Sequence, residues 1–468
     1  MSEVQQPGTT RLPQGDPRAL DSPVRDSRAQ GARGHGSRLD RWVDSYASRT
    51  RGMTASEIRA LFAVASRPEV VSLAGGMPFL SALPLDVVGE ALARLVAERG
   101  TVALQYGSGQ GDPGLRDRII DVMAPQQVQA HPDDVVVTTG SQQALDLVTR
   151  IFVDPGDVVL AEAPSYVGAL GVFRAYQADV VHVPLDDDGL DPDALEDTLR
   201  RLQAQGRRVK LLYTVPNHHN PAGVTMSAER RPRVVEIAHR HGVLVLEDDP
   251  YGLLGFEGDP LPSLHSHDPE AVIYLGSFSK TFAPGFRVGW AVAPHAVRER
   301  LVLASEAAIL CPSAFSQLAV CSYLQGHDWK HQVGVFRDLY RQRRDATLDA
   351  LADLLPSARW TVPVGGFYVW VRLPGGLNAK AMLPRAVTQR VAYVPGTAFY
   401  ADDQGQDYLR LSYCYPTPER IREGVRRLAA VVESELEVQQ TFGGETGWGT
   451  PAPSNPHRRV QSPGPDLT

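Results

Sequence analysis

Cysteine, lysine and long apolar runs are scarce in this chain, and each shortage narrows the class of protein. Three cysteines among 468 residues, Cys311, Cys321 and Cys414, make an odd count without metal-ligand spacing, which argues against a disulfide framework and a cysteine zinc site. No stretch approaches the roughly 18 apolar residues of a membrane helix, and the N-terminal region lacks the apolar core of a secretory signal. We expect a cytoplasmic protein that is neither exported nor membrane-bound.

The two ends of the chain differ in composition from its middle. Residues 1–38 and 439–468 are rich in small, polar and charged residues and have few large apolar side chains, so burial cannot offset the entropy of ordering them. We expect both segments to be disordered. The formal net charge is −7, which gives no support for a nucleic-acid or membrane-surface partner.

Between these ends, short apolar runs rich in β-branched residues alternate with helical patterns. The runs cover 135–138, 158–161, 180–183, 209–213, 243–246, 272–275 and 288–292, and the helical patterns include 142–151 and 230–241. This alternation predicts an α/β fold with βαβ units and a mainly parallel sheet. After a helical region near 337–354, strand patterns within 360–373, 391–394 and 408–413 and a helix from 418 to about 432 predict a smaller α+β domain.

Lysine is so rare that one lysine stands out. The cationic side chains are nearly all arginine, and the four lysines lie at positions 210, 280, 330 and 380. Lys280 alone follows an apolar strand and two serines, in Gly276-Ser277-Phe278-Ser279-Lys280, with Arg287 shortly after it. A lysine amine that is sheltered from water can form a Schiff base, which arginine cannot. Lys280 therefore predicts pyridoxal phosphate; an ordinary ion pair of a loop lysine is the alternative.

Polar residues follow the ends of other predicted strands, where parallel sheets bind their ligands. Ser141 and Gln142 begin a helix after the strand at 135–138 and could cradle a phosphate, although simple N-capping by Ser141 would also explain the pattern. Asp248 could hold a pyridine nitrogen protonated, and Asn220 could donate a hydrogen bond to the ring's phenolic oxygen. Taken singly, the Asn-Pro and Asp-Pro pairs are also typical of turns.

The order of these motifs resembles one family, the fold type I class I/II aminotransferases, in the branch of the α-aminoadipate, kynurenine and aromatic amino acid aminotransferases. The resemblance covers roughly residues 51–432 and depends on these segments: Ser72-Leu73-Ala74-Gly75-Gly76-Met77-Pro78, Leu104-Gln105-Tyr106, Thr139-Gly140-Ser141-Gln142-Gln143-Ala144-Leu145-Asp146, Ala163-Pro164-Ser165-Tyr166, Asn220-Pro221-Ala222-Gly223, Glu247-Asp248-Asp249-Pro250-Tyr251, the Lys280 loop, and Leu409-Arg410-Leu411-Ser412-Tyr413.

The resemblance implies five segments of the chain. They are a disordered leader (1–38), a segment contributing to the small domain and a dimer interface (39–100), a large domain that binds pyridoxal phosphate (101–335), a C-terminal small domain (336–438) and a disordered tail (439–468).

The resemblance also implies roles for residues around the cofactor ring. Lys280 would form the Schiff base and then move the proton between substrate and cofactor. Asp248 would pair with the pyridinium nitrogen, Asn220 and Tyr251 would bond the phenolic oxygen, and Tyr166 would stack on the ring. The two tyrosines could instead simply pack against the sheet, as half-buried tyrosines often do.

Further positions are implied for the phosphate and for the substrate. Arg410 would clamp the substrate α-carboxylate, for which a planar guanidinium is suited, together with Gly76 and Asn220. Arg59 matches a position that can contact an acidic substrate side chain. Both arginines have a simpler interpretation as solvated surface residues. The phosphate would be held by Ser141, Gln142, Ser277 and Arg287, with Tyr106 reaching over from a second subunit, so the active site would need a homodimer.

Three departures from the family pattern bear on the reaction. The usual threonine of the Asn-Pro-Thr-Gly turn is Ala222, the usual leucine before the phosphate arginine is Phe286, and His218 and His219 directly precede Asn220. Imidazoles beside a cofactor could redirect the chemistry to elimination, replacement or carbon–carbon bond formation. A polar turn near the cleft is the simpler interpretation, and no partnering cysteine or His-Glu spacing favours zinc.

Other classes of protein fit less well. The Gly109–Gly114 segment matches G-x-G-x-x-G, but Pro113 and its polar surroundings favour an irregular loop over a dinucleotide-binding helix start. The leader before Arg51 looks too short and too poor in apolar residues for the DNA-binding domain of an aminotransferase-like regulator. A catalytically silent binding protein is a third hypothesis, which the complete set of Lys280, Asp248 and Asn220 disfavours.

The sequence therefore predicts an aminotransferase of amino acid metabolism or biosynthesis. We expect it to move an α-amino group between an amino acid and a 2-oxo acid by a ping-pong mechanism, with glutamate and 2-oxoglutarate on one side. The identity of the other amino donor does not follow from the sequence, because loops shape the side-chain pocket.

Overall fold

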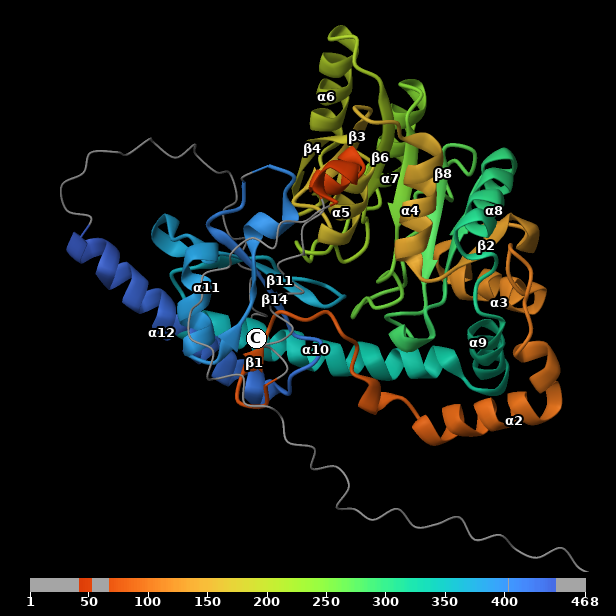
Figure 1. The fold of residues 1–468 in the computed structure, drawn as a ribbon. Helices are drawn as coiled ribbons and strands as arrows, with labels where there is room; N and C mark the ends of the chain where they lie inside the picture. Colours follow the sequence, from red (N-terminus) through yellow and green to blue (C-terminus); the bar gives the residue numbers. More distant parts are fainter. Residues whose placement is uncertain (1–41, 53–66, 403, 443–468) are drawn as a thin grey trace, which may run out of the picture. The chain divides into compact units, whose positions relative to one another are not determined.

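The computed structural model describes residues 42–52, 67–402 and 404–442. Contacts along the chain divide it into two units, Met1–Ser48 and Arg49–Thr468. In the first unit the described residues include the 3-10 turn η2 (Val43–Ser45); the sheets and helices considered below belong to the second (Figure 1). Arg59 and the leader expected to be disordered lie outside the described residues.

The centre of the second unit is an 8-stranded sheet with the order β2-β9-β8-β7-β6-β3-β4-β5. The four adjacent pairs from β8 to β4 are parallel, while β9 pairs antiparallel with both β8 and β2. The prediction of a mainly parallel sheet is confirmed. The strands are β2 (Val135–Thr138), β3 (Val158–Ala163), β4 (Asp179–Asp186), β5 (Gly189–Leu190), β6 (Val209–Thr214), β7 (Leu244–Asp248), β8 (Val272–Ser277) and β9 (Gly289–Val292).

Helices cover both faces of this sheet, which is why its central strands are continuously apolar rather than alternating. Residues of α4 (Ser141–Phe152), α5 (Val167–Ala175) and α8 (His295–Ile309) pack in one apolar cluster with one face. Residues of α6 (Pro192–Ala204) and α7 (Arg230–Arg240) pack in another cluster with the other face. The layers are visible in Figure 1.

A smaller α+β region follows along the chain. It contains an antiparallel sheet with the order β10-β11-β14-β13 and a parallel pair β1-β12. Helix α10 (Trp329–Leu354) runs across the boundary expected at residue 336, which stays a prediction. Helix α12 runs on to Phe442, past its expected end near 432, so the tail expected from 439 begins inside a helix. The elements are β1 (Val71–Ser72), β10 (Arg359–Trp360), β11 (Tyr368–Arg372), α11 (Ala379–Thr388), β12 (Val391–Ala392), β13 (Val394–Pro395), β14 (Tyr408–Ser412) and α12 (Pro418–Phe442).

The glycine-rich segment 109–114 is only partly the irregular loop that we expected. Helix α3 (Pro113–Met123) begins inside it, and the Asp112 side chain caps this helix by accepting a hydrogen bond from the Leu115 amide at 2.9 Å. Proline is favoured at the first position of a helix because its missing N–H is not needed there. Two more helices, α2 (Leu85–Ala103) and α9 (Ala314–Gly326), pack against each other.

The described residues show neither a membrane-spanning helix nor a cluster of metal ligands. None of the helices within 42–52, 67–402 and 404–442 combines the length and apolar character needed to cross a membrane. Over the same ranges, no group of three or more His, Cys, Asp and Glu side chains is arranged to hold a metal ion.

Candidate active site

The phosphate cradle is built where strand β2 turns into helix α4. Gly140 is the N-cap residue with a φ of 75°, and no side chain caps this helix. The N-capping role considered for Ser141 is therefore wrong, and the first amide groups of α4 are left for another partner. Arg287 lies beside them, because a Cβ atom on Gly140 would come within 2.5 Å of its Nη2. Free amides and a guanidinium together suit a phosphate.

Strand β8 and helix α5 add polar groups to this end of the sheet. Ser277 ends β8, and its hydroxyl accepts a hydrogen bond from the Ser279 amide at 3.0 Å. Gln142, near the start of α4, donates to the Gly168 carbonyl at 3.2 Å and accepts from the Tyr166 hydroxyl at 3.4 Å. Burial raises the pKa of Tyr166 to about 12, so its hydroxyl keeps its proton at neutral pH.

Asp248 and Asp249 are neighbours, and either carboxyl group is a candidate to pair with a pyridine nitrogen. Asp248 ends strand β7 and is buried; Oδ2 accepts a hydrogen bond from the Tyr213 hydroxyl at 2.8 Å, while Oδ1 has no partner among the described residues. Burial is the largest effect on its pKa, which rises to about 7, with Tyr213 and Lys280 opposing the rise. An unpaired buried carboxyl oxygen is what a pyridinium N–H would satisfy.

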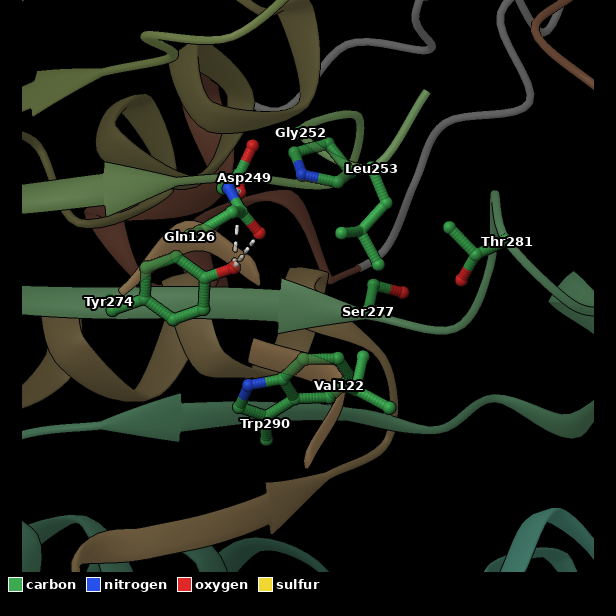
Figure 2. A pocket seen from close by; sticks show the side chains of 10 residues that line it. Val122, Gln126, Asp249, Gly252, Leu253, Tyr274, Ser277, Thr281 and Trp290 are labelled. Carbon is green, nitrogen blue, oxygen red and sulfur yellow. Dashed lines mark hydrogen bonds between the residues drawn. The ribbon is translucent and has the colours of Figure 1, made fainter. Parts of the chain in front are cut away.

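Asp249 faces a different environment and is fully satisfied by the protein. Oδ1 accepts from the Asn217 side chain at 3.0 Å, and Oδ2 accepts from the Tyr274 hydroxyl at 3.1 Å and from Gln126. Figure 2 shows this carboxylate directed at Tyr274 and Gln126, in a small pocket that Ser277 also lines. These partners leave Asp248, rather than Asp249, with an oxygen that could bond a ring nitrogen.

Lys280 lies just beyond strand β8, as predicted. Its Nζ donates to the Gly76 carbonyl at 2.8 Å and lies 5.8 Å from the centre of the Phe367 ring. Burial, together with the nearby charges of Arg410 and Arg287, lowers its pKa to about 8, while Cys414 and Asp248 oppose this shift. A lysine with a depressed pKa is a stronger nucleophile at neutral pH because more of it is unprotonated. Lys210, in contrast, is occupied by an ion pair with Asp157 at 3.1 Å.

The substrate end of the site is supplied by the small sheet. Arg410, in strand β14, is 2 % exposed, so the solvated-arginine alternative is wrong. Its Nη1 donates to Asn220 Oδ1 at 2.7 Å and its Nη2 to the Ala74 carbonyl at 2.6 Å, while Nε has no partner. Among the described residues no carboxylate forms an ion pair with Arg410. A buried guanidinium without a counter-ion requires an anion from outside the chain.

A second tyrosine, which the sequence did not point to, completes this end. The Tyr251 hydroxyl donates to the Tyr368 hydroxyl at 3.3 Å. The Tyr368 ring lies 4.1 Å from Cζ of Arg410, and a Cβ atom on Gly76 would come within 2.1 Å of the Tyr368 oxygen. Glycine at position 76 is therefore required by this close approach. In the sequence, the only mark of Tyr368 is its position two residues after Gly366. That position does not show which groups its hydroxyl contacts.

Tyr106, one of the predicted residues, forms no hydrogen bond with the other predicted site residues in the described part of the chain. The residue is 78 % exposed, and its backbone amide donates to the Gln105 side chain at 3.0 Å. Arg59 lies outside the described residues, so its role stays a prediction. Tyr213 is a further site residue that was missed; its position in an apolar strand resembles that of an ordinary core residue, and only the pairing of β6 with β7 brings its hydroxyl to Asp248.

His218 and His219 are buried structural residues rather than free imidazoles. His219 Nε2 lies 3.1 Å from Glu162 Oε2, and its Nδ1 accepts a hydrogen bond from the Ala222 amide at 3.2 Å. His218 pairs with Thr225 at 3.0 Å, and burial lowers its pKa to about 3, so it stays neutral. Neither ring forms a hydrogen bond with Lys280 in the described part of the chain.

The arrangement fits pyridoxal phosphate on the chain's own geometry. Asp248 Oδ1 is a buried acceptor without a donor, and the start of α4, which has no side-chain cap and lies beside Arg287, suits a phosphate. Lys280 adds a buried amine with a lowered pKa. Asn220 accepts a hydrogen bond from Arg410, and Tyr251 donates one to Tyr368.

Comparisons with known proteins agree with this site. Residues 68–428 match the family model of aminotransferase class I and II. The chain is 41% identical over 396 residues to the aromatic-amino-acid aminotransferase 1 of Thermococcus litoralis, covering 84% of this chain and 95% of that protein. It is 39% identical over 402 residues to the 2-aminoadipate transaminase of Thermus thermophilus, covering 85% and 98%.

A solved structure extends the likeness to three dimensions. The kynurenine aminotransferase of Pyrococcus horikoshii, crystallised in complex with PMP, superposes with a TM-score of 0.81 at 38% identity, covering 85% of this chain and 99% of that one. The fold and site are those of an enzyme that carries pyridoxal phosphate. The chain belongs to the class I and II aminotransferases and is a pyridoxal-phosphate-dependent transaminase.

The different partners of the two acids predict different effects of their replacement. Asp248→Asn should lower the rate at which an amino donor converts the bound cofactor by about 10²- to 10³-fold, because a charge opposite the ring nitrogen is lost. Asp249→Asn should mainly lower the melting temperature, because its oxygens bond only protein groups. Stopped-flow absorbance and thermal unfolding measure the two effects, and the opposite pattern would assign the ring to Asp249.

The lowered pKa of Lys280 predicts the pH dependence of cofactor capture. The amine is protonated below its pKa, so the rate at which apoprotein takes up pyridoxal phosphate should rise with pH and level off above about 8, rather than near the value of about 10.4 for an exposed lysine. Rapid-mixing absorbance measures this rate, and Lys280→Ala is the blank. A rate still rising steeply at pH 10 would show that Lys280 is not desolvated.

Proposed function

We propose that this aminotransferase acts by a ping-pong mechanism, taking the amino group from an aromatic or 2-aminoadipate-like amino acid and delivering it to 2-oxoglutarate. The proposal rests mainly on Arg410. Its buried guanidinium donates to Asn220 and to the Ala74 carbonyl, and it has no carboxylate partner among the described residues. The names of the relatives from Thermococcus litoralis and Thermus thermophilus support the choice of donor class.

Each residue then has one task. Arg410 binds the α-carboxylate of either substrate, since both partners of a transamination carry that group, and its planar fork fixes the orientation of the α-carbon. Lys280 would take the proton from the substrate α-carbon and deliver it to the cofactor, so that the α-carbon becomes that of the 2-oxo acid. The cofactor supplies the electron sink, and Asp248 stabilises the charge on its ring nitrogen.

The alternative reaction type loses its motivation. Elimination, replacement or carbon–carbon bond formation was considered because His218 and His219 precede Asn220. Their contacts with Thr225, Glu162 and the Ala222 amide explain their presence as parts of the buried structure instead. A simple transamination therefore needs no further acid or base.

A screen of single amino donors tests the proposed substrates. In the absence of any 2-oxo acid, incubation with an aromatic amino acid, 2-aminoadipate, kynurenine or glutamate should convert the bound cofactor to pyridoxamine phosphate and release one equivalent of the matching 2-oxo acid. Mass spectrometry identifies both products. Side-chain loss or a condensation product would instead support the alternative reaction, and conversion by glutamate alone would refute the proposed donor class.

We also propose a homodimer with shared active sites. Large apolar side chains are exposed near the end of α2 and along α8. The two regions are neighbours, because a Cβ atom on Gly109, shortly after α2, would meet Glu306 of α8. Soluble monomers rarely leave such patches uncovered. The exposed residues are Val96, Val102, Leu104, Tyr106, Leu303, Ile309 and Leu310.

A biosynthetic role and a cytoplasmic location belong to the same proposal. The three free cysteines favour the cytoplasmic location, because the cytoplasm is reducing.

Complementation between two inactive variants tests the sharing of sites. A mixed dimer of Lys280→Ala and Tyr106→Ala subunits contains one site with an intact Lys280 and an intact Tyr106, if Tyr106 serves the partner's site. Co-expression should then recover up to about half of the wild-type activity for the mixed dimer, with light scattering giving twice the chain mass. A mixed dimer no more active than the Tyr106→Ala homodimer would show that Tyr106 does not cross the interface.

A further inference from the structure

Tyr368 lies at a junction of groups that the reaction uses. It is the first residue of strand β11, is 2 % exposed, and its register pairs it with Ser412, two residues beyond Arg410. The face of its ring lies against the Arg410 guanidinium, with 4.1 Å between the ring centre and Cζ. Its hydroxyl meets the hydroxyl of Tyr251 at 3.3 Å.

The hydroxyl of Tyr368 also borders the segment that holds Lys280. A Cβ atom on Gly76 would come within 2.1 Å of the Tyr368 oxygen, and the Gly76 carbonyl accepts the hydrogen bond from Lys280 Nζ at 2.8 Å. Among the described residues, Tyr251 is the hydrogen-bond partner of the Tyr368 hydroxyl. Its tip is therefore placed in the site and is not satisfied elsewhere.

The number of protons on these two hydroxyl groups limits how they can bond. Tyr251 has one O–H, which here points to Tyr368. If Tyr251 donates that hydrogen to the phenolic oxygen of the cofactor, as proposed for this family position, it can no longer donate to Tyr368. Tyr368 must then turn its own O–H towards the Tyr251 oxygen, because a hydroxyl can accept while it donates.

We propose that Tyr368 is a positioning residue with two parts: its hydroxyl donates to Tyr251 and strengthens the bond from Tyr251 to the cofactor, and its ring orients the Arg410 guanidinium for the substrate carboxylate. Hydrogen bonds in a chain polarise one another, so a donor to Tyr251 makes Tyr251 a better donor. A guanidinium that stacks over an aromatic face is attracted by the ring, and the attraction is largest when both are desolvated.

The surroundings keep both hydroxyl groups protonated, which this relay requires. Burial raises the pKa of Tyr251 and of Tyr368. The titratable groups that face the pair are Arg410, which opposes the rise for both, together with Tyr166 beside Tyr251 and Cys414 beside Tyr368. Lys280 and Asp248 face the cofactor from the other strands of the site.

The experiment compares Tyr368→Phe, Tyr251→Phe and the double variant as holoenzymes. The readout is the pH midpoint of the cofactor's absorbance change, which reports the hydrogen bonds to its phenolic oxygen. Tyr251→Phe should raise the midpoint most. Tyr368→Phe, which keeps the ring, should raise it by a few tenths of a pH unit. In the double variant Tyr368→Phe should add nothing, because its effect passes through Tyr251.

The proposal rests on the role proposed for Tyr251, and the outcomes separate the two. A midpoint unchanged in Tyr251→Phe would refute the role of Tyr251 and the relay with it. A shift in Tyr251→Phe with none in Tyr368→Phe, or additive shifts in the double variant, would refute the relay alone.

A second pair of variants tests the ring. Tyr368→Phe should keep the KM for the amino donor close to wild type, whereas Tyr368→Leu should raise it about tenfold with a smaller effect on kcat, because the face under Arg410 is lost. Thermal unfolding of both holoenzymes checks that they are folded. Equal KM values for the two variants would refute the orienting role of the ring.

Discussion

The unpaired oxygen of Asp248 is the constraint on which the rest of the site depends. A buried carboxyl group without a donor is unfavourable, and here burial raises its pKa to about 7. Tyr213 from the adjacent strand β6 satisfies one oxygen and fixes the orientation of the other. The sheet thereby leaves one buried carboxyl oxygen without a donor, which is the group that a charged ring nitrogen would satisfy.

The same principle appears at the other end of the site. The Arg410 guanidinium is removed from water, held by Asn220 and the Ala74 carbonyl, and left without a carboxylate among the described residues. A buried cation and a buried acid, each incompletely compensated by the protein, favour a ligand that carries the opposite charge at each end. An amino acid bound to a pyridine cofactor has that charge distribution.

Much of this could be predicted from the sequence because the signals are local. A rare lysine after an apolar strand, an acid at a strand end and a small-residue turn before a helix each follow from a few neighbouring residues. The mainly parallel sheet followed from the alternation of runs and helical patterns. Tyr368 and Tyr213 could not be found in this way, because an apolar strand with a tyrosine is the same pattern whether the hydroxyl faces a ligand or the core.

Residue types and order along the chain were enough to determine the family, the cofactor and the central sheet. Only the tertiary structure decided that Asp248 rather than Asp249 has a free oxygen, that Arg410 is buried beside Asn220, and that His218 and His219 belong to the buried framework. The reason is that hydrogen bonds are satisfied between strands and loops far apart in sequence. Which polar groups remain unpaired can be counted only once those distant partners are in place.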